Sequence, residues 1–395
     1  MVRKLFLVLM FLLQLIALLE AQELEFSGYY ENQFFPQELN NELILQDYNK
    51  LRLDLSAEIS ENVSFNADYI YSVFHGKTDF NTFDFIPESV VQAYAEEIQT
   101  PVDSLRPQFD FEYEDENYLD NTYLTMYFQR VNVRVGKQQL PWGTGYTWNP
   151  TDIFNEKNIL DPTYEKIGVN AFKAEVPFKG EGMLTGILSI GDEWETSTKA
   201  LKIKQHFFGF DLSGSFVEKN QDGFDYFSFT ETWERRWLFG GDFSGELMDL
   251  GVWAEGAYNK MEVSKNYGQY LFGVDYTFEN ELYLMGEYYK NELGKSNKNQ
   301  YDINDWMRLL GADGENLGQD YIFIGERYPI TELWNWSNYI LVNLDDESGI
   351  IYPWFEYSFN DNTELQFVGF IPFGEKETEF GEFGAGGLAR VRVYF

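Results

Sequence analysis

Apolar and polar residues alternate along most of the chain. In the segment 48–59, leucine and alanine occupy alternate positions from 51 to 57, while Arg52, Asp54 and Glu58 lie on the other face. A period of two residues indicates β-strands with one apolar and one polar face. Clusters of Asn and Asp, which favour turns, separate the alternating segments. Each segment has about 9–12 residues, the length that a tilted strand needs to cross a bilayer.

The connections between these segments are of two kinds. Short links such as 60–62 join the two members of a pair, whereas longer acidic links such as 75–120, 139–166 and 292–318 join successive pairs. Single-chain outer-membrane barrels have an even number of strands, short periplasmic turns and long outer loops. We therefore expect an all-β fold, a transmembrane antiparallel β-barrel of about eighteen strands, with sixteen strands as the alternative. The segments expected to be strands are 24–34, 48–59, 63–74, 121–129, 131–138, 167–176, 183–190, 199–206, 208–218, 235–246, 249–260, 268–279, 281–291, 319–328, 332–343, 349–359, 364–373 and 384–395.

The first residues of the chain have the pattern of an export signal. Arg3 and Lys4 precede an apolar run at 5–19 that is too short to span a bilayer. A basic segment followed by a short apolar one is typical of a secretory signal peptide. We expect a signal peptide at 1–22 and the outer-membrane barrel at 23–395.

The last residues also alternate, and they end on an aromatic side chain. From 389 to 395, alanine, valine and phenylalanine occupy one face, and Arg390 and Arg392 lie on the other. A terminal aromatic residue in an alternating strand resembles the insertion signal of bacterial outer-membrane barrels. We therefore expect Phe395 to engage the barrel-assembly machinery, and the protein to lie among the lipids of the outer membrane of a diderm bacterium.

Composition and charge exclude several classes of protein. The mean hydropathy is -0.38 and 24% of the residues are charged, which excludes a helical membrane bundle. The chain has no cysteine, which excludes disulfide scaffolds and thiol catalysis. Its formal net charge of -36 disfavours nucleic acid as a partner. Aromatic residues make up 18% of this polar chain, as expected where alternate residues face lipid and water.

Few residues offer chemistry for catalysis or metal binding. The two histidines, His75 and His206, lie beside no recognisable nucleophile motif, and the sequence contains no G-x-S-x-G. Acidic segments at 110–116 and 313–316 lack the spacing of a twelve-residue calcium loop. We therefore expect the protein not to be an enzyme and to hold no cofactor or metal.

The charged faces of the strands are expected to line the barrel interior. A charge in the middle of a strand is costly against lipid and favourable against water. A barrel of about eighteen strands is wide enough for an aqueous lumen unless a loop fills it. The predicted lumen charges are Arg52, Asp54, Glu58, Lys202, Lys204, Arg390 and Arg392, with further acidic residues that include Asp68, Asp211, Asp242, Glu255, Asp275 and Glu287.

The segment 131–155 combines a strand with an irregular loop. Alternating residues lead into a stretch rich in glycine and tryptophan, in which Pro141 and Pro150 prevent regular strand pairing. The residues Val133-Arg134-Val135-Gly136-Lys137-Gln138, then Trp142-Gly143-x-Gly145 and Asn149-Pro150-x-Asp152, resemble a pattern of the porin superfamily. The pattern is similar to that of phosphate-selective porins and related substrate-specific barrels. The chain differs from a phosphate-selective channel in lacking a run of loop lysines.

This resemblance implies a loop that folds inward and narrows a pore. In trimeric porins the corresponding third outer loop forms the constriction, so 139–166 would have this role here and the chain would form a homotrimer. The hypothesis that follows is a channel for passive diffusion of small hydrophilic solutes. The residues expected at the pore and its constriction are Arg130, Arg134, Lys137, Gln138, Trp142, Tyr146, Trp148 and Asp152.

Two other functions are compatible with the same sequence. A non-conducting barrel would bind or anchor surface polysaccharide or an envelope partner, with 75–120 and 139–166 packed across its lumen. A barrel enzyme would depend on His75 or His206. The net charge of the whole chain does not fix the ion preference of a pore, because exposed charges are screened beyond about 8–10 Å in physiological salt.

Overall fold

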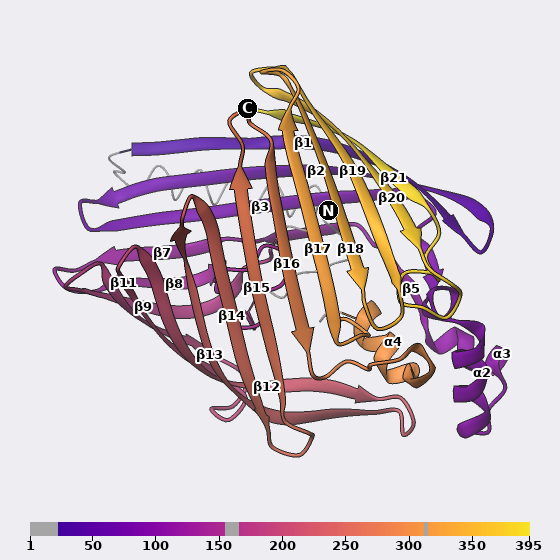
Figure 1. Ribbon diagram of the computed structural model, residues 1–395. Helices are drawn as coiled ribbons and strands as arrows, with labels where there is room; N and C mark the ends of the chain where they lie inside the picture. Colours follow the sequence, from indigo (N-terminus) through magenta and orange to yellow (C-terminus); the bar gives the residue numbers. More distant parts are fainter. Residues whose placement is uncertain (1–22, 155–165, 312–314) are drawn as a thin grey trace, which may run out of the picture.

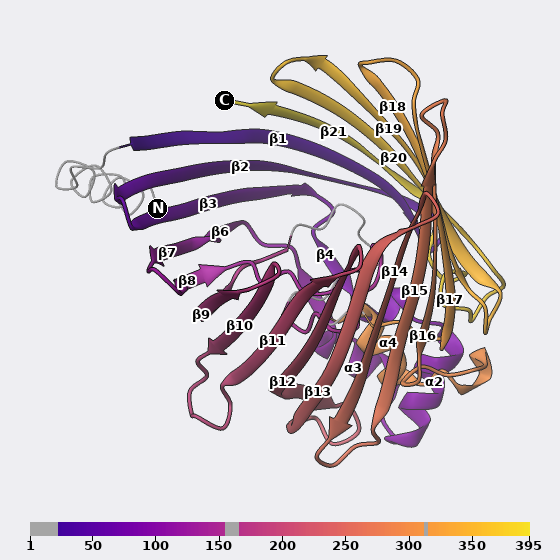
Figure 2. The same cartoon turned by 60° about the vertical axis from the view of Figure 1, so that its left-hand side comes forward.

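The protein is a closed β-barrel that carries a few short helices at one end (Figures 1 and 2). The computed structural model describes residues 23–154, 166–311 and 315–395. The expected signal peptide at 1–22 lies outside the described residues, as does the middle of the 139–166 loop.

The barrel has eighteen strand positions, as the sequence predicted. Its sheet contains nineteen strands, but β6 and β7 both pair with β3 and follow each other along it, so they occupy one position. Neighbouring strands are antiparallel, and β1 pairs with β21 to close the barrel. The barrel strands are β1 (Glu23–Leu39), β2 (Glu42–Ser60), β3 (Val63–Gly76), β6 (Glu116–Leu119), β7 (Thr122–Tyr127), β8 (Asn132–Gln138), β9 (Val169–Phe178), β10 (Gly182–Ser189), β11 (Thr198–Phe207), β12 (Phe210–Asp225), β13 (Thr230–Leu247), β14 (Leu250–Met261), β15 (Tyr267–Thr277), β16 (Tyr283–Asn291), β17 (Asp320–Pro329), β18 (Trp334–Asn343), β19 (Ser348–Asn360), β20 (Thr363–Phe373) and β21 (Gly386–Tyr394).

Two hairpins are longer than the sequence predicted. β1 and β2 are joined by only two residues, Asn40 and Asn41, both with positive φ (52° and 63°). Paired residues with positive φ form the tight turn that suits the twist of a hairpin, and Asn tolerates this conformation. β12 and β13 likewise continue their pairing from Phe210↔Gly245 to Asp225↔Thr230.

The long connections all lie at one end of the barrel, here called the loop end, and the opposite end, called the turn end, has short links alone in the described chain. Links such as β2–β3 and β19–β20 form the turn end, and the β3–β6, β8–β9 and β16–β17 links belong to the loop end. In the described chain the helices lie in the loop-end connections, and none of them has the length and apolar composition to cross a membrane. They are η1 (Thr82–Phe85), α2 (Glu88–Glu97), α3 (Val102–Leu105), η2 (Arg106–Gln108), η3 (Lys298–Gln300) and α4 (Ile303–Leu310); β4 (Asp79–Asn81) and β5 (Asp110–Glu112) form a separate two-stranded sheet there.

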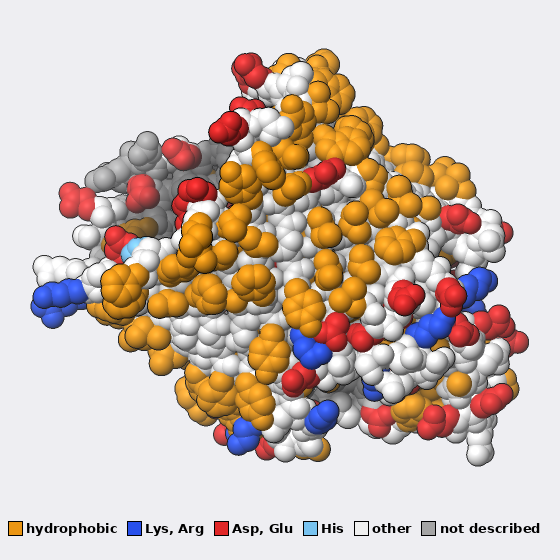
Figure 3. Space-filling view, viewed as in Figure 1, with side chains coloured by type: hydrophobic (Ala, Val, Ile, Leu, Met, Phe, Trp, Pro, Cys, Tyr) orange, Lys and Arg blue, Asp and Glu red, His pale blue; other side chains and the backbone are white. Residues whose placement is uncertain are grey.

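Apolar side chains cover the outside of the barrel wall. Tyr258, Tyr270 and Phe272 on β14 and β15 are exposed by 47%, 47% and 52%. Figure 3 shows that such side chains form a broad band over the visible wall, whereas acidic and basic side chains gather toward the end that carries the helices. An outward apolar band is the arrangement that a barrel in lipid requires.

An apolar core also fills part of the barrel interior. Tyr94 of α2 and Trp306 of α4 belong to one cluster with Tyr289, Ile350 and Phe370 of the barrel wall. The sequence prediction assigned apolar strand faces to lipid and polar faces to the lumen. That assignment is wrong for the wall from β14 to β21 near the loop end, because there the inner face packs against loops and helices instead of water.

A buried polar cluster connects three segments of the loop end. Glu379, in the β20–β21 connection, is fully buried and accepts hydrogen bonds from Asn343 Nδ2 at 2.6 Å, from Leu317 N at 3.2 Å and from the Tyr321 hydroxyl. The backbone N–H of Glu379 donates to Asp346 at 2.8 Å. Burial, together with the nearby charge of Asp346, raises the pKa of Glu379 to about 7.

A charged contact reinforces the seam between β1 and β21. Glu31 is 1% exposed, and its carboxylate lies 2.5 Å from Arg392 Nη2 and 3.5 Å from Arg390 Nε. The Tyr48 hydroxyl donates to the same carboxylate at 2.7 Å. The first and last strands are therefore joined by side chains as well as by their backbones.

The raised pKa of Glu379 predicts that the loop end loses stability as pH rises. The contribution of protonated Glu379 to the free energy of unfolding is fully present below about pH 4.5. It falls by about 3 kcal/mol as pH rises through about 7, because ionisation in the buried site is costly. Hydrogen exchange of the Leu317 amide, corrected for the intrinsic rate, should show less protection at about pH 8 than at about pH 5. Glu379→Gln should remove this difference, and the exposed Glu377→Gln should keep it; equal pH dependence in both variants would contradict the assignment.

Glu31→Gln should weaken the closed barrel. Loss of this charge removes the one carboxylate that lies against both Arg390 and Arg392 among the described residues, which costs about 3 kcal/mol of unfolding free energy. Denaturant unfolding of the protein in detergent micelles, followed by circular dichroism, measures the change. Glu25→Gln, at an exposed site on the same strand, should unfold like the unsubstituted protein. A Glu31→Gln protein with unchanged stability would show that the seam does not depend on this contact.

Candidate functional site

The first part of the 139–166 segment, residues 139–154, lies inside the barrel. Leu140, Trp142 and Ile153 form an apolar cluster with residues of β9 to β14. Trp148 belongs to the other apolar cluster, with residues of β14 to β21. The alternate residues of these strands form the exposed apolar band, so the loop contacts the inner face. The described part of the loop therefore follows the inner wall across about half of the barrel strands.

Glu255 of β14 holds the loop through its backbone. Its carboxylate accepts hydrogen bonds from Thr144 N at 2.7 Å, from Thr151 N at 2.6 Å and from Thr151 Oγ1 at 2.8 Å. Gly143 permits this approach, because it has a φ of +86° and a Cβ there would lie 2.6 Å from Glu255 Oε2. Glu255 is only 3% exposed, so the loop amides replace the water that would otherwise solvate its charge.

Glu287 of β16 provides a second attachment of the same kind. Its two carboxylate oxygens accept hydrogen bonds from Tyr146 N at 2.5 Å and from Thr147 N at 2.7 Å. The indole Nε1 of Trp253 donates to it at 2.7 Å. Two carboxylates on neighbouring parts of the wall thus bind successive backbone amides of one loop, which fixes the loop's path.

Aromatic contacts position the side chains of the loop. The ring of Trp148 stacks on Tyr289 with centroids 4.8 Å apart, and its Nε1 donates to Asn316 at 2.8 Å. Tyr146 stacks against Phe323 and Tyr339, at centroid distances of 5.7 and 6.2 Å, and is 50% exposed. Trp148 is therefore part of the core, whereas Tyr146 presents one side to the lumen.

Asp152 stabilises the return of the loop. Its carboxylate accepts hydrogen bonds from Trp142 N at 3.2 Å and from Phe154 N at 3.2 Å, and it pairs with Lys166 Nζ at 2.8 Å. Lys219 of β12 donates to the carbonyl of Ile153 at 3.0 Å. Asp152 is 2% exposed, so it acts within the loop and does not face the lumen.

A second part of the inner wall is charged. Directly paired residues share a face, and following the pairs from Glu287 through β17 to β21 and on to β2 places Arg390, Arg392 and Arg52 on the inward face. Arg52 pairs with Asp54 at 2.7 Å and with Asp68 at 2.8 Å. The wall formed by β21 and β1–β3 thus carries arginines and carboxylates in contact with each other.

Other predicted lumen residues lie at separate positions on the inner face of the barrel. Lys202 pairs with Asp242 at 3.1 Å, and its Nζ lies 5.6 Å from the ring centroid of Trp142. Lys204 pairs with Asp211 at 2.7 Å nearer the turn end. Glu58 is exposed and lies opposite Ser64, close to the β2–β3 turn.

The structure does not bring all of the predicted constriction residues together. Arg134 lies on the inward face of β8, where its guanidinium lies 4.3 Å from the ring centroid of Tyr123 and Nε donates to Thr125 at 3.3 Å. Gln138 is fully buried and donates to the Ala171 carbonyl at 2.9 Å, so it contributes to the wall and does not contact solutes.

Two of the predicted positions require correction. Arg130 lies in the β7–β8 link at the turn end, a full strand length from the β8–β9 loop, because β8 begins only at Asn132. Lys137 shares the outward face of β8 with Val133 and Val135, and its Nζ donates to the Leu119 carbonyl at 3.0 Å. Neither residue faces the loop segment 139–154.

The sequence did not reveal the residues that receive the loop. Glu255 and Glu287 were predicted only as lumen charges, and Phe323 and Tyr339 were assigned no role. The alternation of residues places all four side chains on the inward face of strands β14–β18, and this was the signal that the sequence contained. That signal does not identify a loop as the partner, because parity gives the face of a residue and not its contacts.

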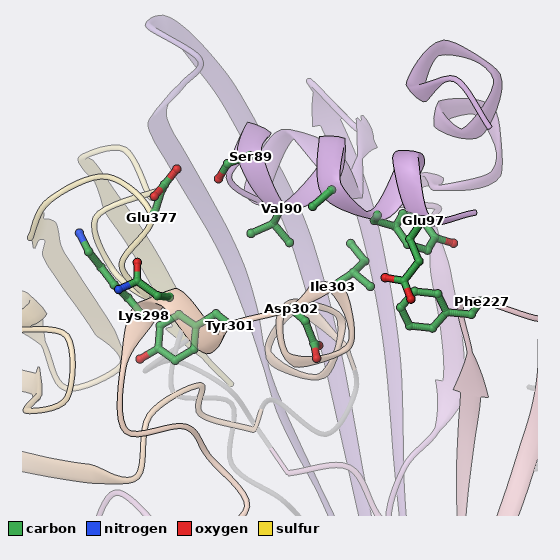
Figure 4. A pocket seen from close by; sticks show the side chains of 12 residues that line it. Ser89, Val90, Glu97, Phe227, Lys298, Tyr301, Asp302, Ile303 and Glu377 are labelled. Atoms are coloured by element: carbon green, nitrogen blue, oxygen red, sulfur yellow. The ribbon is translucent and has the colours of Figure 1, made fainter. Parts of the chain in front are cut away.

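A hollow of about 300 Å³ lies at the loop end between α2 and the η3–α4 segment (Figure 4). Val90 of α2 faces Ile303 at the start of α4, with Glu97 and Phe227 toward one end. Lys298 lies on the other side and pairs with Glu375 at 2.9 Å. The two helical connections therefore contact each other only in part.

Glu255→Gln should loosen the loop without unfolding the barrel. Hydrogen bonds to a charged acceptor are worth about 1.5–3 kcal/mol, so exchange of the Thr144 and Thr151 amides should accelerate about tenfold or more. Hydrogen–deuterium exchange of the protein in micelles measures both amides. Glu246→Gln, at an exposed position near the β13–β14 turn, should leave both rates unchanged. Unchanged exchange in Glu255→Gln would mean that Glu255 does not hold the loop and that its other contacts suffice.

Comparisons with known proteins identify the fold. No family model matches the chain, and no curated protein matches its sequence. Among solved structures, Acinetobacter baumannii OccAB4 matches with a TM-score of 0.58 at 10% identity, over 95% of this chain and 99% of that one. Acinetobacter baumannii OccAB1 matches with a TM-score of 0.57 at 10% identity, over 95% and 98% of the two chains. A double mutant of OccD1 (OprD) matches with a TM-score of 0.56 at 8% identity, over 95% and 97%. The chain therefore has the fold of the outer-membrane porin-like β-barrels and is structurally similar to the Occ proteins at low sequence identity.

Proposed function

We propose that the protein is a channel for passive diffusion of small hydrophilic solutes across the outer membrane of a diderm bacterium. The observation that carries this proposal is the attachment of residues 139–154 to the inner wall by Glu255 and Glu287. A loop held in this way narrows a lumen at a fixed place, and its shape then decides which solutes pass.

The solute path in this proposal runs between the loop and the charged wall. Tyr146 borders it on the loop side, where its ring is half exposed. Arg134, Arg52 and Arg392 border it on the other side. The charges of Glu255 and Glu287 are taken up by backbone amides, so the arginines and the acids paired with them set the local field that a solute meets.

We propose in addition that the channel assembles with the barrel-assembly machinery and as a homotrimer, and that it is not an enzyme. Phe395 is 53% exposed and its backbone N–H bonds the carbonyl of Gly28 at 3.0 Å, so its ring is accessible to a barrel-assembly partner. A homotrimer in outer-membrane lipid is inferred from the resemblance to trimeric porins. The two histidines serve no catalytic role in this proposal, and His206 pairs with Asp211 at 3.0 Å on the barrel wall.

A non-conducting barrel that binds surface polysaccharide or an envelope partner is the second candidate. The observation in its favour is the apolar core in which α2 and α4 pack against β14 to β21, since this core occupies part of the lumen. The two candidates differ in one measurable property. Planar-bilayer recording of folded protein should give a stable ionic conductance; absence of conductance from folded protein would favour the second candidate.

Arg134→Ala should shift the ion selectivity of the channel toward cations. Two unit charges 4 Å apart in water interact by about 1 kcal/mol, so the cation-to-anion permeability ratio should rise about twofold to fivefold. The reversal potential in a salt gradient measures this ratio. Lys260→Ala removes a cation from the exposed outward face of β14 and should leave the ratio unchanged. An equal ratio in Arg134→Ala and the unsubstituted protein would exclude Arg134 from the narrow part of the path.

A further inference from the structure

A large cavity lies at the loop end, above the charged wall. It has a volume of about 670 Å³ and is bounded by β1–β3, by β19–β21, by α4 and by the segment from η1 to β5. Sites for small ligands usually measure 300–1,000 Å³ and combine aromatic walls with a few polar groups.

Aromatic rings form much of the cavity wall. Phe35, Phe74, Phe85, Phe111, Tyr113 and Phe370 all line it. Phe74 and Tyr113 lie 5.6 Å apart between centroids, and Phe111 and Tyr113 lie 5.9 Å apart at 71°. Phe111 and Tyr113 are exposed by 40% and 45%, so their rings are accessible to a solute from the loop end.

Amide and hydroxyl groups provide the polar part of the wall. The Nε2 atom of Gln46 is buried and has no hydrogen-bond partner within the described residues, although Gln46 lines the cavity. Gln33 and Tyr48 also line it, and both contact charged residues of the wall formed by β21 and β1–β3. Gln33 Oε1 accepts from Arg390 Nε at 2.9 Å, and the Tyr48 hydroxyl donates to Glu31 at 2.7 Å. The cavity is therefore contiguous with the inner wall that borders the solute path.

The balance of charge in the cavity favours an uncharged ligand. Asp47 is the one carboxylate among its lining residues in the described chain, and no lysine or arginine lines it. An anion would meet no cation there. A purely apolar ligand would leave the Gln46 amide without an acceptor. A molecule with apolar C–H faces and many hydroxyl groups satisfies both the rings and the amides.

We propose that this cavity binds neutral saccharides as they approach the narrow part of the lumen. The proposal deepens the channel function and rests on it for the step after binding. Sugar rings stack their C–H faces on Phe111 and Tyr113, and their hydroxyl groups accept from Gln46 Nε2. Release toward Gln33 and Tyr48 then passes the saccharide to the arginine wall.

Calorimetric titration of the full chain in detergent micelles tests the binding site. The probes are maltotriose, xylotriose and raffinose, with gluconate as the anionic comparison. At least one trisaccharide should bind, and gluconate should bind more weakly. Phe111→Ala and Gln46→Leu should each raise the Kd about fivefold, since a ring contact and a hydrogen bond are each worth about 1 kcal/mol. Phe111→Tyr, which keeps the ring, should bind as the unsubstituted protein does.

Phe208→Ala is the matched control, because Phe208 is 87% exposed in the β11–β12 turn at the opposite end of the barrel. Absence of binding by all three trisaccharides, tighter binding of gluconate, or an equal effect of Phe208→Ala and Phe111→Ala would each overturn the proposal. Ionic conductance of the same preparation separates this proposal from the channel function. Saccharide binding without conductance would refute the channel and keep the site, whereas conductance without saccharide binding would refute the site and keep the channel.

Discussion

The pairing of β1 with β21 is the interaction on which the rest of the structure depends. Unpaired backbone N–H and C=O groups cost several kcal/mol each in lipid, so a spanning sheet must close on itself. The register that closes this sheet places Glu31 opposite Arg392. A slip by one residue would turn the inward arginines of β21 toward lipid. Closure, register and the charged lumen wall are therefore consequences of one constraint.

The closed barrel has two different inner walls. From β9 to β20 the inner face packs against the loop 139–154 and the loop-end helices, and it carries tryptophan, tyrosine and aliphatic residues. From β21 to β3 it carries arginines paired with carboxylates. The inner face of β11 to β13 also carries charge, in the Lys202–Asp242 and Lys204–Asp211 pairs. In the proposed channel, a solute between the two walls would meet aromatic rings on one side and the arginines of β21 and β2 on the other.

Carboxylates have opposite roles in the two walls. Glu255 and Glu287 are buried, and their charge is compensated by the backbone amides of the loop. They therefore determine the path of the loop 139–154. Asp54, which is partly exposed, and Asp68, which is buried, pair with the partly exposed Arg52, so they temper the field of its guanidinium. The chain as a whole is strongly acidic, yet the local electric field in the lumen depends on these pairs because distant charges are screened.

The sequence by itself determined the approximate positions of the strands, a number of about eighteen and the face on which Arg52, Arg134 and Arg392 lie. Alternation is a local property with a period of two, so neighbouring residues suffice to reveal it. It did not determine that Glu255 binds the amide of Thr144, 111 residues away, or that β14 to β21 have an apolar inner face. Nor did it reveal the aromatic cavity at the loop end. These features arise only when the closed barrel brings distant strands and loops together, since the partner of an inward residue depends on where each loop crosses the interior.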